Sequence, residues 1–152
     1  MILRRVVDAG GKRYEVSRIQ GFNSTYDVVR LQVADIKKMP TLPIGTEAAI
    51  SGQSVFTMPQ AKADQVTQVE KAGEHAYYTL QSPATPDQAG TPVVDEAGRI
   101  VGMLQAPVTI ANAPNYALDI RFVEALTIRP IDANHADLRQ CTIPKQLPAD
   151  AE

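Results

Sequence analysis

The stretch "TPDQAGTPVVDEAGRIVGML", residues 85–104, joins a loop to two short apolar segments. Its first part is rich in Pro and Gly, and the apolar "PVV" follows directly. The second apolar segment, "IVGML", comes after an Asp-led turn that contains Gly98. Because glycine adopts the positive φ that a tight turn needs, we expect a β-hairpin over residues 93–103.

The same pattern occurs earlier in the chain. "VVDAGGKRYEV" at residues 6–16 has the same order of features as "VVDEAGRIVGM" at residues 93–103. In both segments an Asp-led turn with a glycine separates two strand-like runs. Two interpretations stay open here: a β protein can simply reuse one turn chemistry, or the chain holds two related barrels.

Most of the chain has the alternation of a β-strand. "YDVVRLQV" at residues 26–33 places Asp27, Val29, Leu31 and Val33 on one face. Similar short segments recur at roughly ten-residue spacing, which predicts an all-β barrel or sandwich. Only "LDIRFVEALTI", residues 118–128, has helical periodicity, and there Asp119 can cap the first turn.

The composition is that of an ordinary soluble globular protein. Of the 152 residues, 44% are hydrophobic and 21% are charged, and the net charge is −2. This acidic balance argues against nucleic acid or an anionic membrane as the main partner. No apolar run is long enough for a membrane-spanning helix. The N-terminus lacks the apolar core of a signal peptide, although a signal could have been removed, so the compartment stays open.

The cysteine and histidine pattern predicts neither a disulfide nor a metal site. The chain has a single cysteine, Cys141, so no internal disulfide can form. Neither a C-x-x-C nor an H-E-x-x-H spacing is present for zinc. We therefore expect no cofactor and no metal.

Four segments, taken in order, resemble the trypsin-like serine peptidase fold, and they are most similar to its HtrA/Deg-like branch. The first is "AGGKRYEVSRIQGFNSTYDVVRLQV", and "LPIGTEAAISGQSVFTMP" follows it. "YYTLQSPATPDQAGTPVVDEAGRIVGML" is similar to the nucleophile region of these peptidases, and "NYALDIRFVEAL" to their closing strand and helix. The resemblance covers about residues 2 to 127, and the serial match is more specific than any single piece.

The resemblance implies an all-β architecture, a trypsin-like double β-barrel with an incomplete first barrel and a C-terminal helix. Residues 1–40 would form part of the first β-barrel. Residues 41–128 would form the second β-barrel and the helix. Residues 129–152 are polar and rich in proline, and we expect a tail or a linker to a further domain.

The nucleophile region departs from the family pattern at its chemical positions. By resemblance, Ala89 stands in place of the nucleophilic serine, and an alanine has no hydroxyl to attack a carbonyl. Asp87 stands in place of the oxyanion-hole glycine, where a carboxylate would oppose a developing negative charge. Thr91 is a third departure. One exchange alone could be engineered, whereas three together favour natural loss of the activity.

The rest of the catalytic triad is also incomplete. By resemblance, Asp27 matches the triad aspartate, although an Asp that caps a turn before a strand explains it as well. In this fold the histidine base precedes that aspartate, but both histidines of the chain, His75 and His135, follow it. We therefore expect no functional catalytic residue.

Three functional hypotheses follow. The first is a non-catalytic, pseudo-peptidase domain of a longer protein that binds a protein or an extended peptide. The second is a fragment or a Ser-to-Ala variant of an active trypsin-like serine endopeptidase. The third is an unrelated β-barrel binding module. For the first, a half barrel would leave unpaired strand edges, which favour homo-oligomers, and the resemblance is compatible with a periplasmic or secreted bacterial protein.

Overall fold

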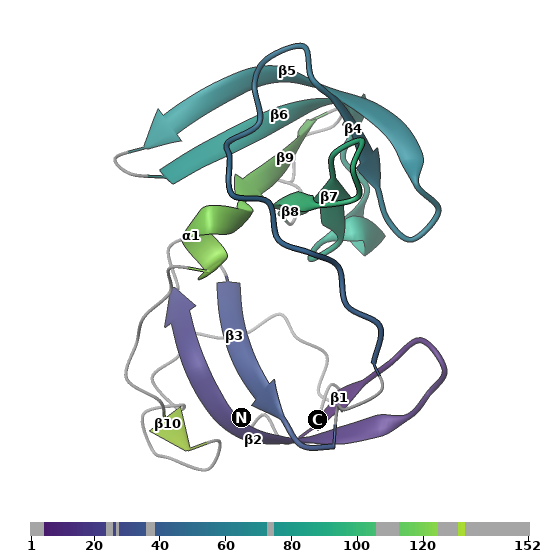
Figure 1. Ribbon diagram of the computed structural model, residues 1–152, viewed down its shortest axis with the longest axis vertical. Coiled ribbons are helices and arrows are strands. Elements are labelled where there is room, and N and C mark those ends of the chain that lie inside the picture. Colours follow the sequence, from purple (N-terminus) through teal and green to yellow (C-terminus); the bar gives the residue numbers. More distant parts are fainter. Residues whose placement is uncertain are drawn as a thin grey trace. The chain divides into compact units, whose positions relative to one another are not determined.

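The computed structural model describes residues 5–23, 26, 28–35, 39–72, 75–105, 113–124 and 131–132. The chain divides into two compact units (Figure 1). The first unit holds residues 1–40 and 126–152, and the second holds residues 41–125. Almost all described elements are strands, as the sequence predicts.

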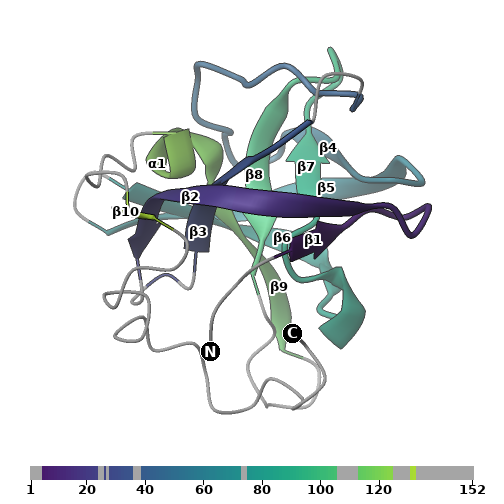
Figure 2. The same cartoon turned by 90° about the horizontal axis from the view of Figure 1, so that it is seen from below.

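The first unit is built on the long strand β2. Its strands are β1 (Arg5–Val7), β2 (Arg13–Asn23), β3 (Val28–Val33) and β10 (Ile131–Asp132). Figure 2 shows β1 against one half of β2 and β3 against the other half. Both β3 and β10 pair with Arg18 and Ile19 of β2, so they lie on its opposite edges.

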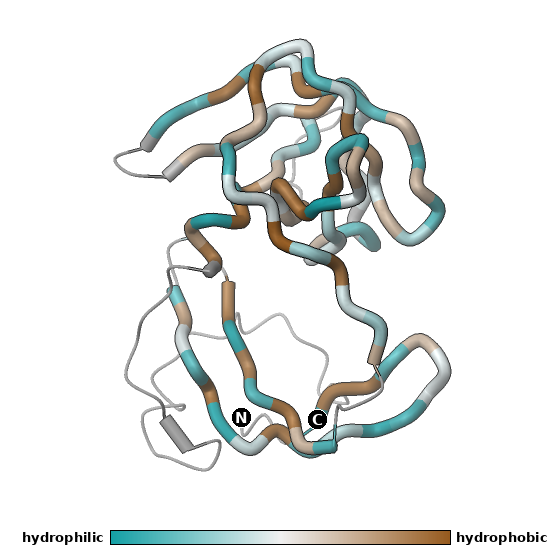
Figure 3. Tube along the Cα trace, viewed as in Figure 1, coloured by the Kyte–Doolittle hydropathy of each residue, from teal (hydrophilic) through white to brown (hydrophobic). Residues whose placement is uncertain are grey.

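The alternation of β2 and β3 produces the small core of this unit. Val16 and Ile19 are buried, and three partly buried side chains pack against them: Val6, Phe22 and Leu31. Apolar and polar residues alternate along the second half of β3 (Figure 3). In that half Leu31 and Val33 are partly buried and Gln32 is exposed, as the period of two in "YDVVRLQV" predicts. At the start of β3 the prediction is wrong, because Val28 is buried and Val29 is 46% exposed.

The second unit contains a closed six-stranded barrel. Its strands are β4 (Ser54–Thr57), β5 (Lys62–Ala72), β6 (His75–Pro83), β7 (Pro92–Val94), β8 (Ile100–Leu104) and β9 (Pro114–Asp119). They pair in the order β4-β5-β6-β9-β8-β7, and β7 returns to β4. Small and β-branched side chains fill the interior around the buried Tyr78 and Leu104. Closure removes the sheet edges that an open sheet would expose.

Two glycines are required by close packing in this unit. A Cβ on Gly45 would lie 2.9 Å from the carbonyl oxygen of Ile100, to which the Gly45 N–H donates at 2.8 Å. A Cβ on Gly102 would meet the backbone of Leu118 at 3.1 Å and the ring of Tyr78 at 3.4 Å. The first glycine lets the segment before the barrel pair with β8, and the second lets β8 lie close to Leu118 and Ala117 of β9.

The two hairpins that the sequence singles out have the same hydrogen bonds. In the first, Asp8 Oδ1 accepts from the N–H groups of Gly10 and Lys12, both at 2.9 Å. In the second, Asp95 Oδ1 accepts from the N–H groups two and four residues on, again both at 2.9 Å. The turn glycines, Gly11 and Gly98, have φ of 84° and 79°. The predicted Asp-led turns with a positive-φ glycine are thus confirmed.

The helix α1 (Ile120–Glu124) follows β9 directly. Asp119 precedes its first residue, and its Oδ1 accepts the N–H of Arg121 at 2.9 Å. This is the bond of an N-cap, so the predicted capping role of Asp119 is confirmed. The remaining residues of the predicted helical segment, 125–128, lie outside the described residues.

Acid should weaken the second hairpin through Asp95. Burial opposes ionisation of this carboxyl, but the bonds and charge of Arg99 outweigh it and lower the Asp95 pKa. The unfolded chain therefore binds the proton more tightly, and stability is lost as the pH falls through the folded-state pKa. We expect Asp95→Asn, whose amide oxygen can still accept the turn bonds, to flatten the fall of the unfolding free energy between pH 5 and pH 2. Urea unfolding at several pH values across this range measures the free energy of unfolding.

The matched control is Glu96→Gln, because Glu96 is the next residue along and is exposed. This substitution should leave the fall of the unfolding free energy between pH 5 and pH 2 unchanged. Equal slopes for the Asp95→Asn variant and the unaltered protein would show that the turn carboxylate contributes no pH-dependent stability.

Candidate functional site

The loop that resembles a nucleophile region connects β6 to β7. It contains the short 3₁₀ helix η1 (Pro86–Gln88), whose proline presets φ at the start of the turn. The N–H of Gln88 donates to the Thr85 carbonyl at 3.2 Å, and the N–H of Thr91 donates to the Gln88 carbonyl at 3.1 Å. The loop thus closes on its own backbone.

Both ends of this loop are fixed to neighbouring strands. At its start, the N–H of Ala84 donates to the Ala113 carbonyl at 3.3 Å. At its end, the N–H of Gly90 donates to the Leu104 carbonyl at 2.7 Å. Gly90 has a φ of 84°, a conformation that favours glycine. The backbone of the loop is therefore anchored to the residue before β9 and to the last residue of β8.

The chemical positions of the loop face solvent. Asp87, Ala89 and Gly90 are exposed, and Gln88 is half-buried. The Ala89 side chain is a methyl group, which can neither donate a proton nor attack a carbonyl. The Asp87 carboxylate is the ionisable group of this loop, and it lies two residues before Ala89.

Asp27, the matched triad aspartate, and the histidines and cysteine for which the sequence predicts no site fall largely outside the described structure. Asp27, His135 and Cys141 lie outside the described residues. His75 is described by its backbone alone, where it pairs with Ala72 at the turn between β5 and β6. The role that the resemblance gives to Asp27 therefore stays a prediction.

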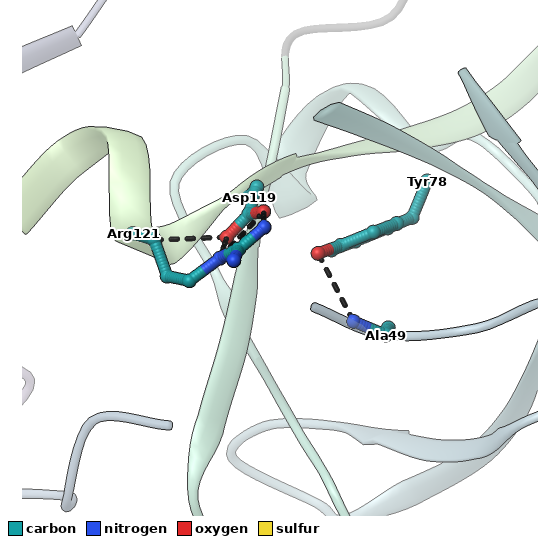
Figure 4. A network of polar contacts seen from close by, with 4 residues as sticks. All are labelled: Ala49, Tyr78, Asp119 and Arg121. Carbon is teal, nitrogen blue, oxygen red and sulfur yellow. Dashed lines mark hydrogen bonds and ion pairs between the residues drawn. The ribbon is translucent and has the colours of Figure 1, made fainter. Parts of the chain in front are cut away.

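A buried ionic network lies where β9 meets α1 (Figure 4). The Asp119 side chain is only 2% exposed, and Arg121 folds back onto it. Arg121 Nη2 donates to Asp119 Oδ2 at 2.7 Å, and Nε donates to the two carboxylate oxygens at 3.0 and 3.2 Å. These bonds to Asp119 are the largest reason why the Arg121 pKa is raised. The sequence suggested a cap here but not the ion pair.

Tyr78 extends this network into the barrel. Its hydroxyl accepts the N–H of Ala49 at 3.1 Å (Figure 4). Burial, and after it the neighbouring Asp119 charge, raise the pKa of Tyr78 to about 12. The phenol therefore stays neutral at physiological pH. The Asp119 carboxylate is thus held by Arg121, and the Tyr78 ring lies beside this pair (Figure 4).

Metal-binding clusters and membrane-spanning helices were sought in the described part of the chain. There, no group of three His, Cys, Asp or Glu residues could hold a metal ion. None of the helices described has the length and apolarity needed to cross a membrane.

Comparisons with known proteins identify the fold. The family model described as "Trypsin-like peptidase domain" matches residues 2–103. No curated protein matches the chain. Among solved structures, the active form of the Rv3671c protease from M. tuberculosis superimposes with a TM-score of 0.63 at 18% identity, over 83% of this chain and 65% of that one. This chain thus spans less than two thirds of that structure.

Two further structures agree. The HtrA-type protease AlgW, solved with a decapeptide, gives a TM-score of 0.61 at 15% identity, over 79% of this chain and 41% of AlgW. Deg5 superimposes with a TM-score of 0.56 at 19% identity, over 82% of this chain and 69% of Deg5. These likenesses confirm the predicted trypsin-like, all-β fold and its similarity to the HtrA/Deg-like branch.

Removing the cation of the buried network should destabilise the protein. Arg121→Met keeps the length of the side chain but leaves the Asp119 carboxylate without its ion-pair partner. Because the Arg121 side chain is itself 44% exposed, we expect a loss of about 2 kcal/mol, less than for a wholly buried pair. Urea unfolding at neutral pH measures this loss of unfolding free energy.

Arg5→Met is the matched control. Arg5 pairs with Glu15 at 3.4 Å, and both side chains are more than half exposed. An exposed pair of this kind contributes little, so the control should unfold close to the unaltered protein. Equal losses in the two variants would contradict a special role for the buried carboxylate.

Proposed function

Because the chain belongs to the trypsin-like peptidase domain family, we propose that it is a non-catalytic member that binds a protein or an extended peptide. The observation that carries this proposal is Ala89, which stands in place of the nucleophilic serine by resemblance. A methyl group offers no oxygen to form an acyl-enzyme intermediate.

The neighbouring residues support the proposal. Asp87 stands where the family pattern has the oxyanion-hole glycine, and it brings a negative charge close to the place where an oxyanion would form. Loss of one oxyanion-hole donor costs roughly 3–4 kcal/mol of transition-state stabilisation, and a carboxylate there adds repulsion. Thr91 is a third departure beside an otherwise retained scaffold, since Gly90 keeps its positive φ and Pro92 begins β7.

Peptide binding is supported by the retained shape of the loop. The loop is fixed at both ends to β8 and β9, so its backbone is ordered without any catalytic group. The similar AlgW structure holds a decapeptide. A domain of this fold without a nucleophile can hold such a chain without cleaving it. Strand addition gives affinity through main-chain bonds and requires no reactive side chain. Self-association through strand edges stays a prediction.

The alternative function is that of a serine endopeptidase in which Ala89 replaces a native serine. The observation that favours it is the intact backbone of the loop, with the same Gly90 anchor that a working site would need. The two functions differ in what a restored hydroxyl would do. In an otherwise complete site it would regain activity, whereas in a degenerate site it would not.

The unaltered protein should neither react with a fluorophosphonate probe nor hydrolyse fluorogenic peptides, because Ala89 has no hydroxyl. The deciding variant is Ala89→Ser, which restores only the hydroxyl. We expect the rates of probe labelling and peptide hydrolysis by Ala89→Ser to stay within about tenfold of those of the unaltered protein. Triad members act as a unit, and a serine without its base is a weak nucleophile. Trypsin serves as the positive control in both assays. Strong labelling of Ala89→Ser would instead support the endopeptidase alternative.

A further inference from the structure

The sheet of the first unit has an outward face, turned away from its small core, that carries four arginines. They are Arg5 of β1, Arg13 and Arg18 of β2, and Arg30 of β3, and all four are exposed. Each comes directly before an apolar residue that is buried or packs against the core: Val6, Tyr14, Ile19 and Leu31. Because side chains alternate between the two faces of a strand, the four arginines share the outward face. We call it the arginine face.

Few carboxylates balance the arginine face. The four strands of this sheet contain two acidic residues, Glu15 and Asp132. Glu15 pairs with Arg5 at 3.4 Å, and Asp132 of β10 lies opposite Arg18 in the register. Arg13 has no ion pair with any residue that the structure describes. The sheet therefore carries more positive than negative charge.

The excess of positive charge is confined to one part of the chain. Residues 1–40 contain eight basic and four acidic residues, whereas residues 41–125, the second unit, contain four basic and nine acidic ones. Two of those four basic residues, Arg99 and Arg121, are paired with aspartates of the second unit. The net charge of −2 is thus the sum of a basic N-terminal segment and an acidic second unit.

We propose that the arginine face binds an acidic segment of a polypeptide through the carboxylates of its Asp and Glu residues. Arginine is suited to this partner, because the N–H groups of a guanidinium match the two oxygens of a carboxylate in a bidentate pair. The proposal concerns the first unit and does not rest on the loop that carries Ala89, so either proposal can fail alone.

The positions of the arginines fit an extended chain. Between Val16 and Arg18 the register of β2 against β3 shifts by one residue, so Arg13 and Arg18 lie four strand steps apart. This is about 13 Å along the strand, the separation of residues i and i+4 in an extended segment. Arg30 lies on the neighbouring strand, opposite Gly21, and lengthens the row beyond Arg18. A segment with acidic residues at alternate positions therefore has carboxylates in register with the row.

Two observations favour a polypeptide over a nucleic acid or an anionic membrane. Val7 is 60% exposed and lies opposite Arg13, so the arginine face also offers an apolar contact that a neighbouring side chain of a polypeptide can cover. The second unit has a net charge of −5, which repels a long polyanion or a charged bilayer. A short acidic segment needs to approach only the first unit.

The test is fluorescence anisotropy of the full chain with a labelled, acetylated and amidated peptide of twelve residues in which Glu alternates with Thr. The reference peptide has Gln in place of every Glu. In 50 mM salt the unaltered protein should bind the Glu peptide at least about tenfold more tightly than the Gln peptide. In 500 mM salt this advantage should fall to less than about threefold, because the exposed charges are screened.

The deciding variant combines Arg13→Gln with Arg18→Gln. It should bind the Glu peptide at least about fivefold more weakly and melt close to the unaltered protein, because both side chains are exposed. The matched control combines Lys62→Gln with Lys71→Gln, which removes the same charge from exposed positions of β5. This control should bind the Glu peptide within about twofold of the unaltered protein.

Three results would overturn the proposal. Equal binding of the Glu and Gln peptides would show that carboxylates are not recognised. Equal losses in the two double variants would show an effect of net charge without a defined face. Stronger displacement of the labelled peptide by oligothymidylate, or by vesicles that contain phosphatidylserine, than by unlabelled Glu peptide would assign the arginine face to phosphate groups. None of these results bears on the loss of catalysis at Ala89.

Discussion

The buried carboxylate of Asp119 is the constraint on which the second unit depends. A charge at 2% exposure is tolerated only with partners, and the chain supplies them from nearby in sequence. Arg121 brings the countercharge, and the Arg121 N–H caps the helix on the same oxygen. The carboxylate thus fixes the end of β9, the start of α1 and the position of the Arg121 side chain together.

The constraint extends through Tyr78 to a distant segment. The tyrosine comes from β6, and its hydroxyl holds the N–H of Ala49, 29 residues earlier in the chain. Beside the ring, Gly102 lets β8 lie close to β9, because a Cβ there would be 3.1 Å from the carbonyl oxygen of Leu118. One ionised group, one phenol and one glycine therefore bring three strands and the segment before the barrel into register. Loss of any of the three would disturb the same end of the barrel.

Much of this architecture was accessible from the sequence, because the signals are local. The Asp-led turns are built from residues at most four apart, so Asp8 and Asp95 with their glycines predict them directly. The cap of α1 is equally local. The ion pair and the tyrosine contact were not predicted, since Tyr78 and Asp119 meet only once β6 and β9 pair. Asn115 was missed for the same reason. That Asn115 is buried becomes evident only when closure of the barrel shows which face of β9 is inside.

The two ends of the barrel illustrate how scaffold and site can separate. At the end with Asp119, the carboxylate and the Arg121 guanidinium bind one another, which contributes to rigidity. At the other end, the loop has its backbone fixed through Ala84 and Gly90, and its residues Asp87 and Ala89 are exposed. The backbone of this loop is therefore fixed independently of the residue at position 89, because the anchoring bonds are made by main-chain groups.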